Sequence, residues 1–573
     1  MRLFRRNKIE EKLEYPWYKY YKKEERNIKV SNKSIYEYFE TCAFFHKYET
    51  AINYFNTKIS YEELIEEINT ISSSLINLGI KENDCISICM PNTPEAVIAF
   101  YAVNKIGAIS CMIHPLSSEE EIKHTIKETN SKILISVNFN YNKINNIIKS
   151  TKLDKVVLTS PKISMPDVLK LAYYLKKEIK ENYPEDDNKY ISWKTFKEIG
   201  LNNKKDITIH RKKEDTAIYL HSGGTTGKPK TIVITNENIN TVLEQIKIVF
   251  PELGLNDKFL SILPMFHCFG LVVCILGPLV LGSTAILVPQ FNASRFDKLI
   301  KKYKPNLIIG VPTLFEALVN NPYMRNVDMS YVKYIVSGGD SLSKEKNEKI
   351  NVFLKEHNCN RTLIQGYGMT ETTGGAVIGG RGSNKLGSVG IPLPGNKVKI
   401  IDPITKEEKS PNEIGEIYIT GPIVMKEYLN NKKETEEAVI IIDNERWVHT
   451  GDLAYMDEDG VIFYVQRLKR MLIVSGYNVY PSHLEEVIQK HPKVKQVGVI
   501  GIPHPYKVQV PKAYIVLKNN KDNNHNTIKE IEEYCKKELS YYMIPKKFVF
   551  RESLPTTMIG KIDYKKLEKE NEK

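Results

Sequence analysis

Apolar and polar positions in the first third of the chain alternate between helical and strand periods. Ser60 and Glu63 have the spacing of a helix-capping box, and Gly79 stands where the predicted helix ends. The apolar face of this helix consists of Leu64, Ile68, Ile71, Leu75 and Leu78. Short apolar runs at 85–90, 108–113 and 132–137 predict strands, and the stretches from 94 and over 119–129 predict helices between them. This β-α-β alternation predicts a mostly parallel sheet with helices on its faces.

The rest of the chain divides by composition. Residues 138–214 are polar and rich in lysine, which predicts a surface insertion. Beyond about residue 467, strands are expected at 494–500, 513–517 and 548–551, with helices at 482–490 and 527–539. These elements predict a separate, small α+β domain. We therefore expect a large N-terminal domain over 1–466 and a small C-terminal domain over 467–573.

Composition and charge narrow the class of protein. The chain has 573 residues and a formal net charge of +13, and its length exceeds what one hydrophobic core usually supports. The positive charge suits anionic ligands such as nucleotides or an acidic membrane surface, without identifying either. The eight cysteines include no Cys-x-x-Cys pair, and no secretory signal follows Met1. A cytoplasmic protein with reduced thiols and no nucleic-acid partner is expected.

Two segments raise the question of a membrane. Residues 259–294 contain no Asp, Glu, Lys or Arg, but prolines and glycines interrupt this run, so we expect a loop, a short helix and a strand in a buried core. Residues 165–177 combine lysines with apolar residues at helical spacing. They predict either an ordinary surface helix or one that lies on the inner membrane surface.

The segment 219–230 has the composition of a phosphate-binding loop. Gly223, Gly224 and Gly227 let backbone N–H groups approach phosphate oxygens. Hydroxyl donors and positive charges come from Ser222, Thr225, Thr226, Lys228 and Lys230. Pro229 replaces the Ser or Thr of a Walker A loop, and the strand-like run 231–235 follows. The loop is therefore predicted to join two strands of a hairpin.

This segment resembles the signature loop of the adenylate-forming enzymes, which include acyl-CoA synthetases, peptide-synthetase adenylation domains and luciferases. Further motifs follow in that family's order, so the resemblance runs from about residue 16 to residue 567. It implies an α/β fold in which a large domain with mixed and parallel sheets is joined by a hinge, with its pivot at Lys469, to a small α+β domain. It also implies that ATP is a substrate.

The resemblance implies roles for further residues at the nucleotide. Glu371, together with Thr225, would hold Mg²⁺, Thr370 would bond the α-phosphate, and Lys561 would be the catalytic lysine. The ATP-binding residues implied by the other motifs are Gln365, Gly366, Tyr367, Gly368, Gly339, Asp340, Asp452 and Arg467. Relatives commonly have Ala at the position of Asp340.

For the acid and the acceptor, the resemblance implies an acyl pocket and a site for CoA as co-substrate. The acyl pocket would be lined by His267, Phe269, Val311, Gly338 and Gly374. Members that activate amino acids place an Asp where His267 stands, so this position argues against amino acids. Together with the aromatic run 15–21, the pocket looks most like that of the long-chain fatty acyl-CoA synthetases. Ser475, Gly476 and Tyr477 would meet the pantetheine arm of CoA.

The expected reaction is formation of acyl-AMP from a fatty acid and ATP with release of pyrophosphate, followed by transfer of the acyl group to CoA. The alternatives are a carrier-protein ligase, an aryl or medium-chain acid ligase, a non-catalytic nucleotide-binding relative and an integral membrane transporter. Gln466, Arg470 and the pair Val508-Gln509 depart from the family's pattern. The sequence does not distinguish a monomer from a homodimer.

Overall fold

A computed structural model describes residues 14–175, 184–222, 230–474, 477–504, 508–556 and 562–572. The chain forms two compact units. The large unit comprises residues 1–398, 419–448 and 459–461, and the small unit comprises 399–418, 449–458 and 462–573. The predicted boundary between 466 and 467 lies close to the start of the last small-unit segment and stays a prediction.

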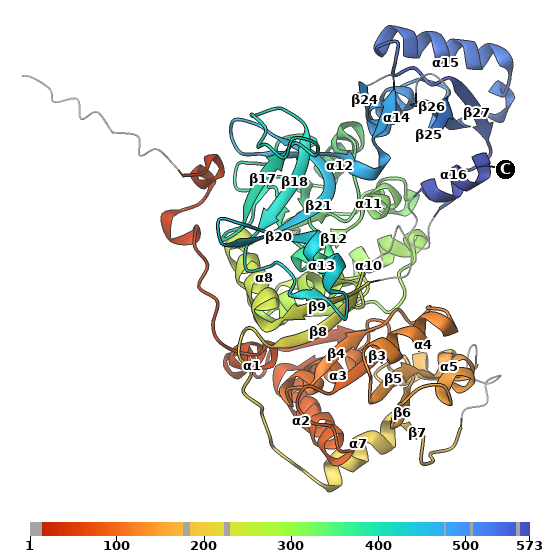
Figure 1. The fold of residues 1–573 in the computed structure, drawn as a ribbon. Helices are drawn as coiled ribbons and strands as arrows, with labels where there is room; N and C mark the ends of the chain where they lie inside the picture. The colour runs from red at the N-terminus through yellow and green to blue at the C-terminus, as the bar shows by residue number, and fades with distance from the viewer. Residues whose placement is uncertain are drawn as a thin grey trace, which may run out of the picture. The chain divides into compact units, whose positions relative to one another are not determined.

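The first sheet of the large unit contains the predicted β-α-β alternation (Figure 1). Its strand order is β19 (Glu427–Tyr428), β9 (Thr231–Thr235), β8 (Thr216–His221), β4 (Ile109–Met112), β3 (Cys85–Cys89), β5 (Ile133–Val137), β6 (Lys155–Thr159) and β7 (Tyr190–Ser192). From β8 to β7 all neighbours are parallel, whereas β9 is antiparallel to both β8 and β19. The predicted parallel sheet is confirmed.

The second sheet of the large unit has nine strands. Its order is β16 (Ile391–Pro392), β15 (Val377–Ile378), β14 (Ile364–Tyr367), β13 (Tyr334–Ser337), β12 (Leu307–Gly310), β10 (Lys258–Ser261), β11 (Thr284–Leu287), β1 (Thr50–Tyr54) and β2 (Thr57–Ser60). The strands from β14 to β1 are parallel. Parallel strands end at one edge of a sheet, so the residues that follow β12, β13 and β14 lie near one another.

Helices surround these sheets. In the large unit they are α1 (Ile35–Phe45), α2 (Tyr61–Asn77), α3 (Pro94–Lys105), α4 (Glu119–Glu128), α5 (Tyr141–Ile148), α6 (Asp167–Tyr173), α7 (Trp193–Asn202), α8 (Asn236–Val249), the π-helix η5 (Phe269–Leu276), α9 (Gly277–Val280), α10 (Phe296–Tyr303), α11 (Pro312–Val319), α12 (Lys344–Glu356) and α13 (Lys432–Ala438). The helix α2 packs against α3 and α7, whereas α4 and α5 cover the sheet with an apolar cluster that includes Ile122 and Ile144 (Figure 1).

The capping prediction for α2 is confirmed. The Ser60 hydroxyl accepts a hydrogen bond from the Glu63 N–H, and the Glu63 carboxylate accepts one from the Ser60 N–H. Four of the five predicted core residues of α2, namely Leu64, Ile68, Ile71 and Leu75, are fully buried. Gly79 has a φ of +84°, the left-handed conformation that ends helices.

The prediction of a surface insertion at 138–214 is wrong in part. Val156, Val157 and Leu158 are buried in β6, which pairs in parallel with β5, and β7 extends the sheet further. A short apolar run inside a lysine-rich segment becomes a strand because a partner edge from another part of the chain is available to it.

The uncharged run 259–294 forms buried core, as predicted. It consists of β10, η5, α9 and β11, and most of its apolar side chains are buried. None of the helices in the described ranges has both the length and the hydrophobicity that crossing a bilayer requires.

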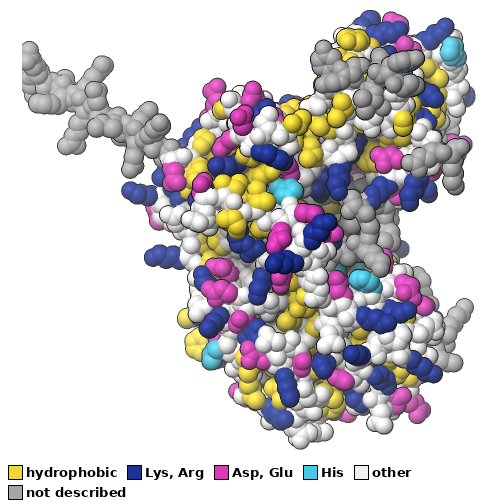
Figure 2. Space-filling view, in the orientation of Figure 1, with side chains coloured by type: hydrophobic (Ala, Val, Ile, Leu, Met, Phe, Trp, Pro, Cys, Tyr) yellow, Lys and Arg dark blue, Asp and Glu magenta, His cyan; other side chains and the backbone are white. Residues whose placement is uncertain are grey.

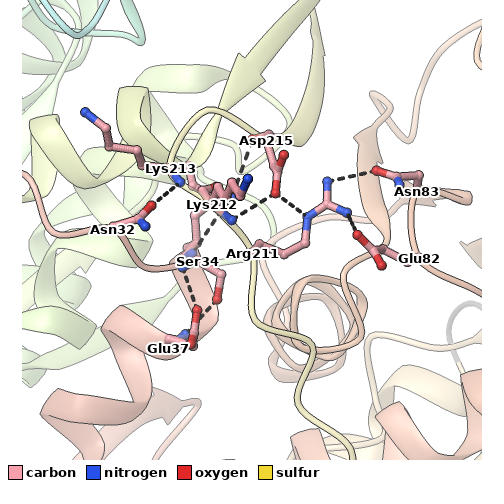
Figure 3. A network of polar contacts seen from close by, with 11 residues as sticks. Asn32, Ser34, Glu37, Glu82, Asn83, Arg211, Lys212, Lys213 and Asp215 are labelled. Atoms are coloured by element: carbon pink, nitrogen blue, oxygen red, sulfur yellow. Dashed lines mark hydrogen bonds and ion pairs between the residues drawn. The ribbon is translucent and has the colours of Figure 1, made fainter.

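A buried arginine anchors the segment that enters β8. The Arg211 guanidinium pairs with Glu82 and Asp215 and donates to Asn83 Oδ1 at 2.8 Å (Figure 3). The next residues continue this network, since the Lys213 N–H donates to Asn32 Oδ1 at 2.9 Å. The network connects the start of β8 to two other parts of the large unit, and thereby fixes the strand that leads into the predicted phosphate loop.

The small unit contains a sheet of order β24 (Tyr477–Val479), β23 (Leu472–Val474), β26 (Val508–Leu517) and β25 (Val494–His504), with β27 (Lys547–Arg551) also paired to β26. Its helices are α14 (Pro481–Gln489), α15 (His525–Glu538) and α16 (Tyr564–Glu572). A further sheet, which is not confined to the small unit, has the order β17 (Lys397–Ile401), β18 (Gly415–Thr420), β21 (Glu445–Met456) and β20 (Val439–Ile442), with β22 (Ile462–Arg467) on β21. The predicted combination of an α/β large part and an α+β small part is confirmed.

Positive and negative side chains lie interspersed on the face shown in Figure 2. This face therefore shows no extended patch of a single charge.

Candidate active site

The stem of the predicted phosphate loop is a closed hairpin. His221 pairs with Thr231 across β8 and β9. The Ser222 N–H donates to the Lys230 carbonyl at 3.0 Å, and the Lys230 N–H donates to Ser222 Oγ at 3.1 Å. The predicted hairpin is therefore confirmed. The residues between these two, including Gly223, Gly224, Thr225, Thr226 and Gly227, lie outside the described residues, so phosphate binding stays a prediction.

His221 lies at the base of the loop and is a residue that sequence reasoning missed. Its Nδ1 is 3.1 Å from Thr231 Oγ1, and its Nε2 is 3.7 Å from Cys111 Sγ. Burial, with a smaller contribution from His124, lowers the pKa of His221 to about 4. The ring is thus neutral near pH 7, and positive charge at the loop comes from lysines. No local pattern marks this histidine, because its burial depends on strands from elsewhere in the chain.

Lys230, at the end of the loop, is in contact with two residues that follow β18. Its Nζ lies 4.6 Å from the centre of the Tyr428 ring, a cation–π distance. The same ammonium group forms an ion pair with Glu434 on α13. The Lys230 charge therefore has a defined place beside the strand β19.

The predicted metal ligand Glu371 is buried next to these residues. It lies in a 3₁₀ turn, Thr370–Thr372, directly after β14, and is 7% exposed. Tyr428 donates its hydroxyl to Glu371 Oε1 at 2.8 Å. Mg²⁺ is commonly bound by one or two carboxylates together with phosphate oxygens and water. A single buried carboxylate near the loop stem fits this requirement, and the described ranges contain no cluster of three or more acidic, His or Cys side chains that would hold a metal by itself.

The two predicted adenine segments lie side by side. Ser337 in β13 pairs with Gln365 in β14, and the Gly338 N–H donates to the Gly310 carbonyl at 3.0 Å. Ser337 Oγ and Gln365 Nε2 are buried and have no hydrogen-bond partner in the part of the chain that is described. Buried polar atoms usually have partners, so these two indicate a place where a polar ligand would bind.

The other residues of these segments occupy the turns around the same edge. Gly339 has a φ of +77°, and the exposed Asp340 accepts a hydrogen bond from the Ser341 N–H at 2.9 Å. Gly366 and Tyr367 pair with β15. A Cβ on Gly368 would lie 2.7 Å from the Gly375 Cα, so the turn after β14 requires glycine there.

Four of the five predicted acyl-pocket residues come together. A Cβ on Gly374 would lie 3.0 Å from the Phe269 backbone nitrogen, and one on Gly338 would lie 3.3 Å from the Phe269 ring. A Cβ on Gly339 would be 3.6 Å from Val311. We call Phe269, Val311, Gly338 and Gly374 the acyl wall. His267 lies two residues before Phe269, and its ring centroid is 4.7 Å from that of Phe266.

The acyl wall lies close to the predicted metal ligand. Cys268, the residue before Phe269, is buried, and burial together with the nearby charge of Glu371 raises the pKa of its thiol. The large unit thus brings together the loop stem, Glu371, the adenine segments and the acyl wall, although these come from positions between 222 and 374 in the sequence.

The predicted ribose ligand belongs to the small unit. Asp452 in β21 is directly opposite Arg467 in β22, and Arg467 Nε is 3.0 Å from Asp452 Oδ1. Asp452 is buried, whereas the arginine side chain is half-exposed. Lys469, the predicted pivot, is exposed in the short turn Leu468–Arg470. The pairing of the predicted ribose carboxylate with the predicted phosphate arginine is consistent with one shared site.

The predicted CoA site and the catalytic lysine are only partly described. Tyr477 begins β24, and only its backbone is described. Ser475, Gly476 and Lys561 lie outside the described residues, and their roles stay predictions.

Two departures from the family's hinge pattern have structural roles in the small unit. Gln466 is buried and its Oε1 accepts a hydrogen bond from the Ser482 N–H at 3.1 Å, next to the start of α14. Arg470 pairs with the buried Glu485 at 2.6 Å and lies 3.7 Å from the centre of the Tyr564 ring. Both side chains therefore hold α14 against the rest of the unit.

Comparisons with known proteins agree over the whole length. A family model described as AMP-binding enzyme matches residues 39–429, and one described as AMP-binding enzyme C-terminal domain matches residues 483–561. The chain is 30% identical to the long-chain-fatty-acid–CoA ligase of Bacillus subtilis strain 168, over 96% of each chain. It is 33% identical to the probable 4-coumarate–CoA ligase 1 of Dictyostelium discoideum, over 88% of each. The fold is shared with ATP-bound MatB from Rhodopseudomonas palustris, with a TM-score of 0.81 and 22% identity over 94% of this chain and 99% of that one.

Proposed function

Since this chain belongs to the AMP-binding enzyme family, with acid–CoA ligases among its relatives, we propose that it is an ATP-dependent acyl-CoA synthetase that acts on fatty acids. In the first step a carboxylate oxygen of the acid attacks the α-phosphorus of ATP, and the bond to the β-phosphate oxygen breaks. Pyrophosphate leaves and acyl-AMP remains. In the second step the CoA thiol gives up its proton to water, its sulfur attacks the acyl carbon, and AMP leaves with the electron pair of the broken C–O bond.

The observation that carries this proposal is the convergence in the large unit of four features. The unpartnered polar atoms of Ser337 and Gln365 lie in the second sheet, and Glu371 and the acyl wall lie close to that edge. The loop stem lies in the first sheet, and Tyr428 contacts both its Lys230 and Glu371. The reaction needs anionic groups to be held together and their charges neutralised, which is what such an arrangement provides.

Each of these residues would have its own role in binding ATP and the acid. Lys230 and the glycines of the loop would hold the β- and γ-phosphates, and Thr370 would bond the α-phosphate. Glu371 would hold Mg²⁺, which supplies charge neutralisation at the phosphates when bound. Asp452 would accept hydrogen bonds from the ribose hydroxyls, and Lys561 would neutralise charge on the attacking carboxylate and the α-phosphate.

A fatty acid is the preferred substrate class because the acyl wall is apolar and His267 stands where amino-acid-activating relatives have an aspartate. The relative from Bacillus subtilis, which covers almost the whole chain, is named for long-chain fatty acids. An aryl acid is the second candidate, because the relative from Dictyostelium discoideum is named for 4-coumarate.

The deciding experiment is a panel of acids assayed with ATP and Mg²⁺ by pyrophosphate release, with and without CoA. We expect acid-dependent release of pyrophosphate and formation of acyl-CoA with a long-chain acid. Lys561→Ala should slow the reaction roughly 10²–10³-fold, the usual effect of losing a transition-state donor. Release of ADP in place of pyrophosphate would refute the proposal. Product formation only with a free carrier protein would show that the acyl acceptor is a carrier protein and not CoA. ATP binding without turnover of any acid would indicate a non-catalytic relative.

We also propose that the enzyme is cytoplasmic and associates peripherally with membranes through α6 and the two residues that follow it. Val168, Leu171 and Leu175 occupy successive turns of one helical face, and each is more than half exposed, between 56% and 81%. Lys162 lies 4.9 Å from the Tyr174 ring next to them. Such a face suits an anionic lipid surface, where the acid substrate also partitions.

Co-sedimentation with vesicles of anionic and of neutral lipid tests this association. Leu171→Glu should lose binding to the anionic vesicles, whereas Ile404→Glu, which alters an equally exposed residue of the small unit, should retain it. Equal sedimentation of both variants would refute a role for α6. Light scattering on the purified protein without vesicles decides between a monomer and a homodimer.

A further inference from the structure

Tyr428 lies where the end of the phosphate loop meets the predicted metal ligand. It belongs to β19, a two-residue strand paired with β9, and it is directly opposite Ile232. Its backbone N–H donates to Thr435 Oγ1 at 2.9 Å, which attaches it to α13 as well. Tyr428 is 5% exposed. The ring is therefore fixed from both sides, and its position does not depend on a flexible segment.

The hydroxyl group of Tyr428 forms a hydrogen bond with Glu371. The O–H donates to Glu371 Oε1 at 2.8 Å, between two buried side chains. A hydrogen bond to a charged acceptor in a buried place is stronger than one between neutral groups.

The face of the same ring contacts Lys230 at the end of the loop. Lys230 Nζ lies 4.6 Å from the ring centre, and Lys230 is the first described residue after the predicted phosphate loop. Glu434 pairs with this ammonium group from the other direction. One aromatic side chain thus touches the carboxylate expected to hold Mg²⁺ and a lysine expected to hold phosphate.

We propose that Tyr428 is a positioning residue that orients the Glu371 carboxylate and couples it to Lys230, so that the predicted metal ligand and this lysine are positioned together. This inference rests on the proposed function. By taking up a lone pair of Oε1, the phenol restricts rotation of the carboxylate and defines which directions remain for other ligands. Through its ring face it also limits where Lys230 can lie.

Two substitutions separate the two contacts of Tyr428. Tyr428→Phe removes the hydrogen bond to Glu371 and keeps the ring under Lys230. Tyr428→Leu removes both. The matched control is Tyr21→Phe, because Tyr21 is as buried as Tyr428 and its hydroxyl donates at 2.9 Å to a backbone carbonyl, that of Pro392, away from the site.

The primary readout is the dependence on Mg²⁺, which a merely structural role would not move. For Tyr428→Phe we expect the Mg²⁺ concentration at half-maximal pyrophosphate release to rise about 10-fold or more, the usual effect of losing a hydrogen bond to a charged group. The KM for the acid should stay unchanged. Tyr428→Leu should in addition raise the KM for ATP, and Tyr21→Phe should match the wild type in its Mg²⁺ dependence and in its KM values.

Calorimetric binding of ATP provides a readout that needs no turnover. Wild type and Tyr428→Phe should bind ATP equally in EDTA, and only the wild type should gain the full increase in affinity when Mg²⁺ is added. An unchanged Mg²⁺ dependence of Tyr428→Phe in both assays would overturn the proposal, and so would an equal shift in Tyr21→Phe. If the wild type binds ATP with Mg²⁺ but turns over no acid, the proposed function fails while the calorimetric comparison still decides this inference.

Discussion

Replacing His221 by glutamine should remove a pH-dependent part of the stability of the large unit. His221 is partly buried at the base of the predicted phosphate loop, between Thr231 and Cys111. Burial lowers its pKa from 6.5 to about 4. In the native state the ring therefore resists protonation, whereas in the unfolded chain it takes up a proton at its ordinary pKa.

The magnitude follows from the difference between the two pKa values. Because the native value is the lower one, the unfolded chain binds the extra proton between pH 6.5 and about 4, and native stability falls as the pH drops through that window. Above about pH 6.5 the contribution is fully present. Each pKa unit corresponds to about 1.4 kcal/mol, so the full loss is roughly 3 kcal/mol, of which about 2 kcal/mol appears between about pH 7.5 and about pH 5.

The three tryptophans make this measurable for the large unit alone. Trp17, Trp193 and Trp447 all belong to that unit and are buried, so tryptophan fluorescence during urea denaturation reports its unfolding. Free energies of unfolding should be measured for wild type and His221→Gln at about pH 7.5 and about pH 5. Other groups titrate equally in both proteins, so the difference between the two proteins isolates His221.

The wild type should lose about 2 kcal/mol more than His221→Gln over this interval. A constant offset between the two proteins at both pH values would mean only that the substitution disturbs packing. It would refute the conclusion that His221 is buried in its neutral form. A larger loss in the variant than in the wild type would refute the sign of the argument as well.

Three further predictions concern other buried groups. Burial raises the pKa of Glu95 to about 6, so the stability of the large unit falls as the pH rises from 4.5 through 6. In the same fluorescence assay, Glu95→Gln should stabilise this unit by about 2 kcal/mol near pH 7.5 but not near pH 4.5. Arg470→Met leaves the largely buried carboxylate of Glu485 without its positively charged partner and should destabilise the small unit by about 3 kcal/mol. Faster proteolysis of that unit, by a protease that cleaves after neither Arg nor Met, measures this loss. Gly374→Ala places a Cβ 3.0 Å from the backbone nitrogen of Phe269 in the acyl wall and should lower kcat/KM for the acid at least about 10-fold. The control is Gly79→Ala, which has a similar φ of +84° but open space around it and should lower only the stability.

Motifs and local structure were readable from the sequence, because they depend on neighbours within a few residues. The capping box of Ser60 and Glu63 and the hairpin that closes at Ser222 and Lys230 join residues three and eight positions apart. Their geometry is set by backbone hydrogen bonds and turn chemistry, so the residues alone predict them. The order of the motifs likewise sufficed for the family, which the comparisons then showed.

Packing over long distances was not readable. The sequence did not show that β6 and β7 extend the sheet, that His221 is buried against Cys111, or that Tyr428 donates to Glu371, 57 residues earlier. Each of these contacts exists only because strands distant in sequence become neighbours, and many partners are compatible with the same local pattern. The sequence by itself thus determined which residues are available for chemistry and the local elements that carry them. The tertiary structure decided which of them are buried, which are charged and which touch, because burial and pairing free energies depend on neighbours that the chain brings together only on folding.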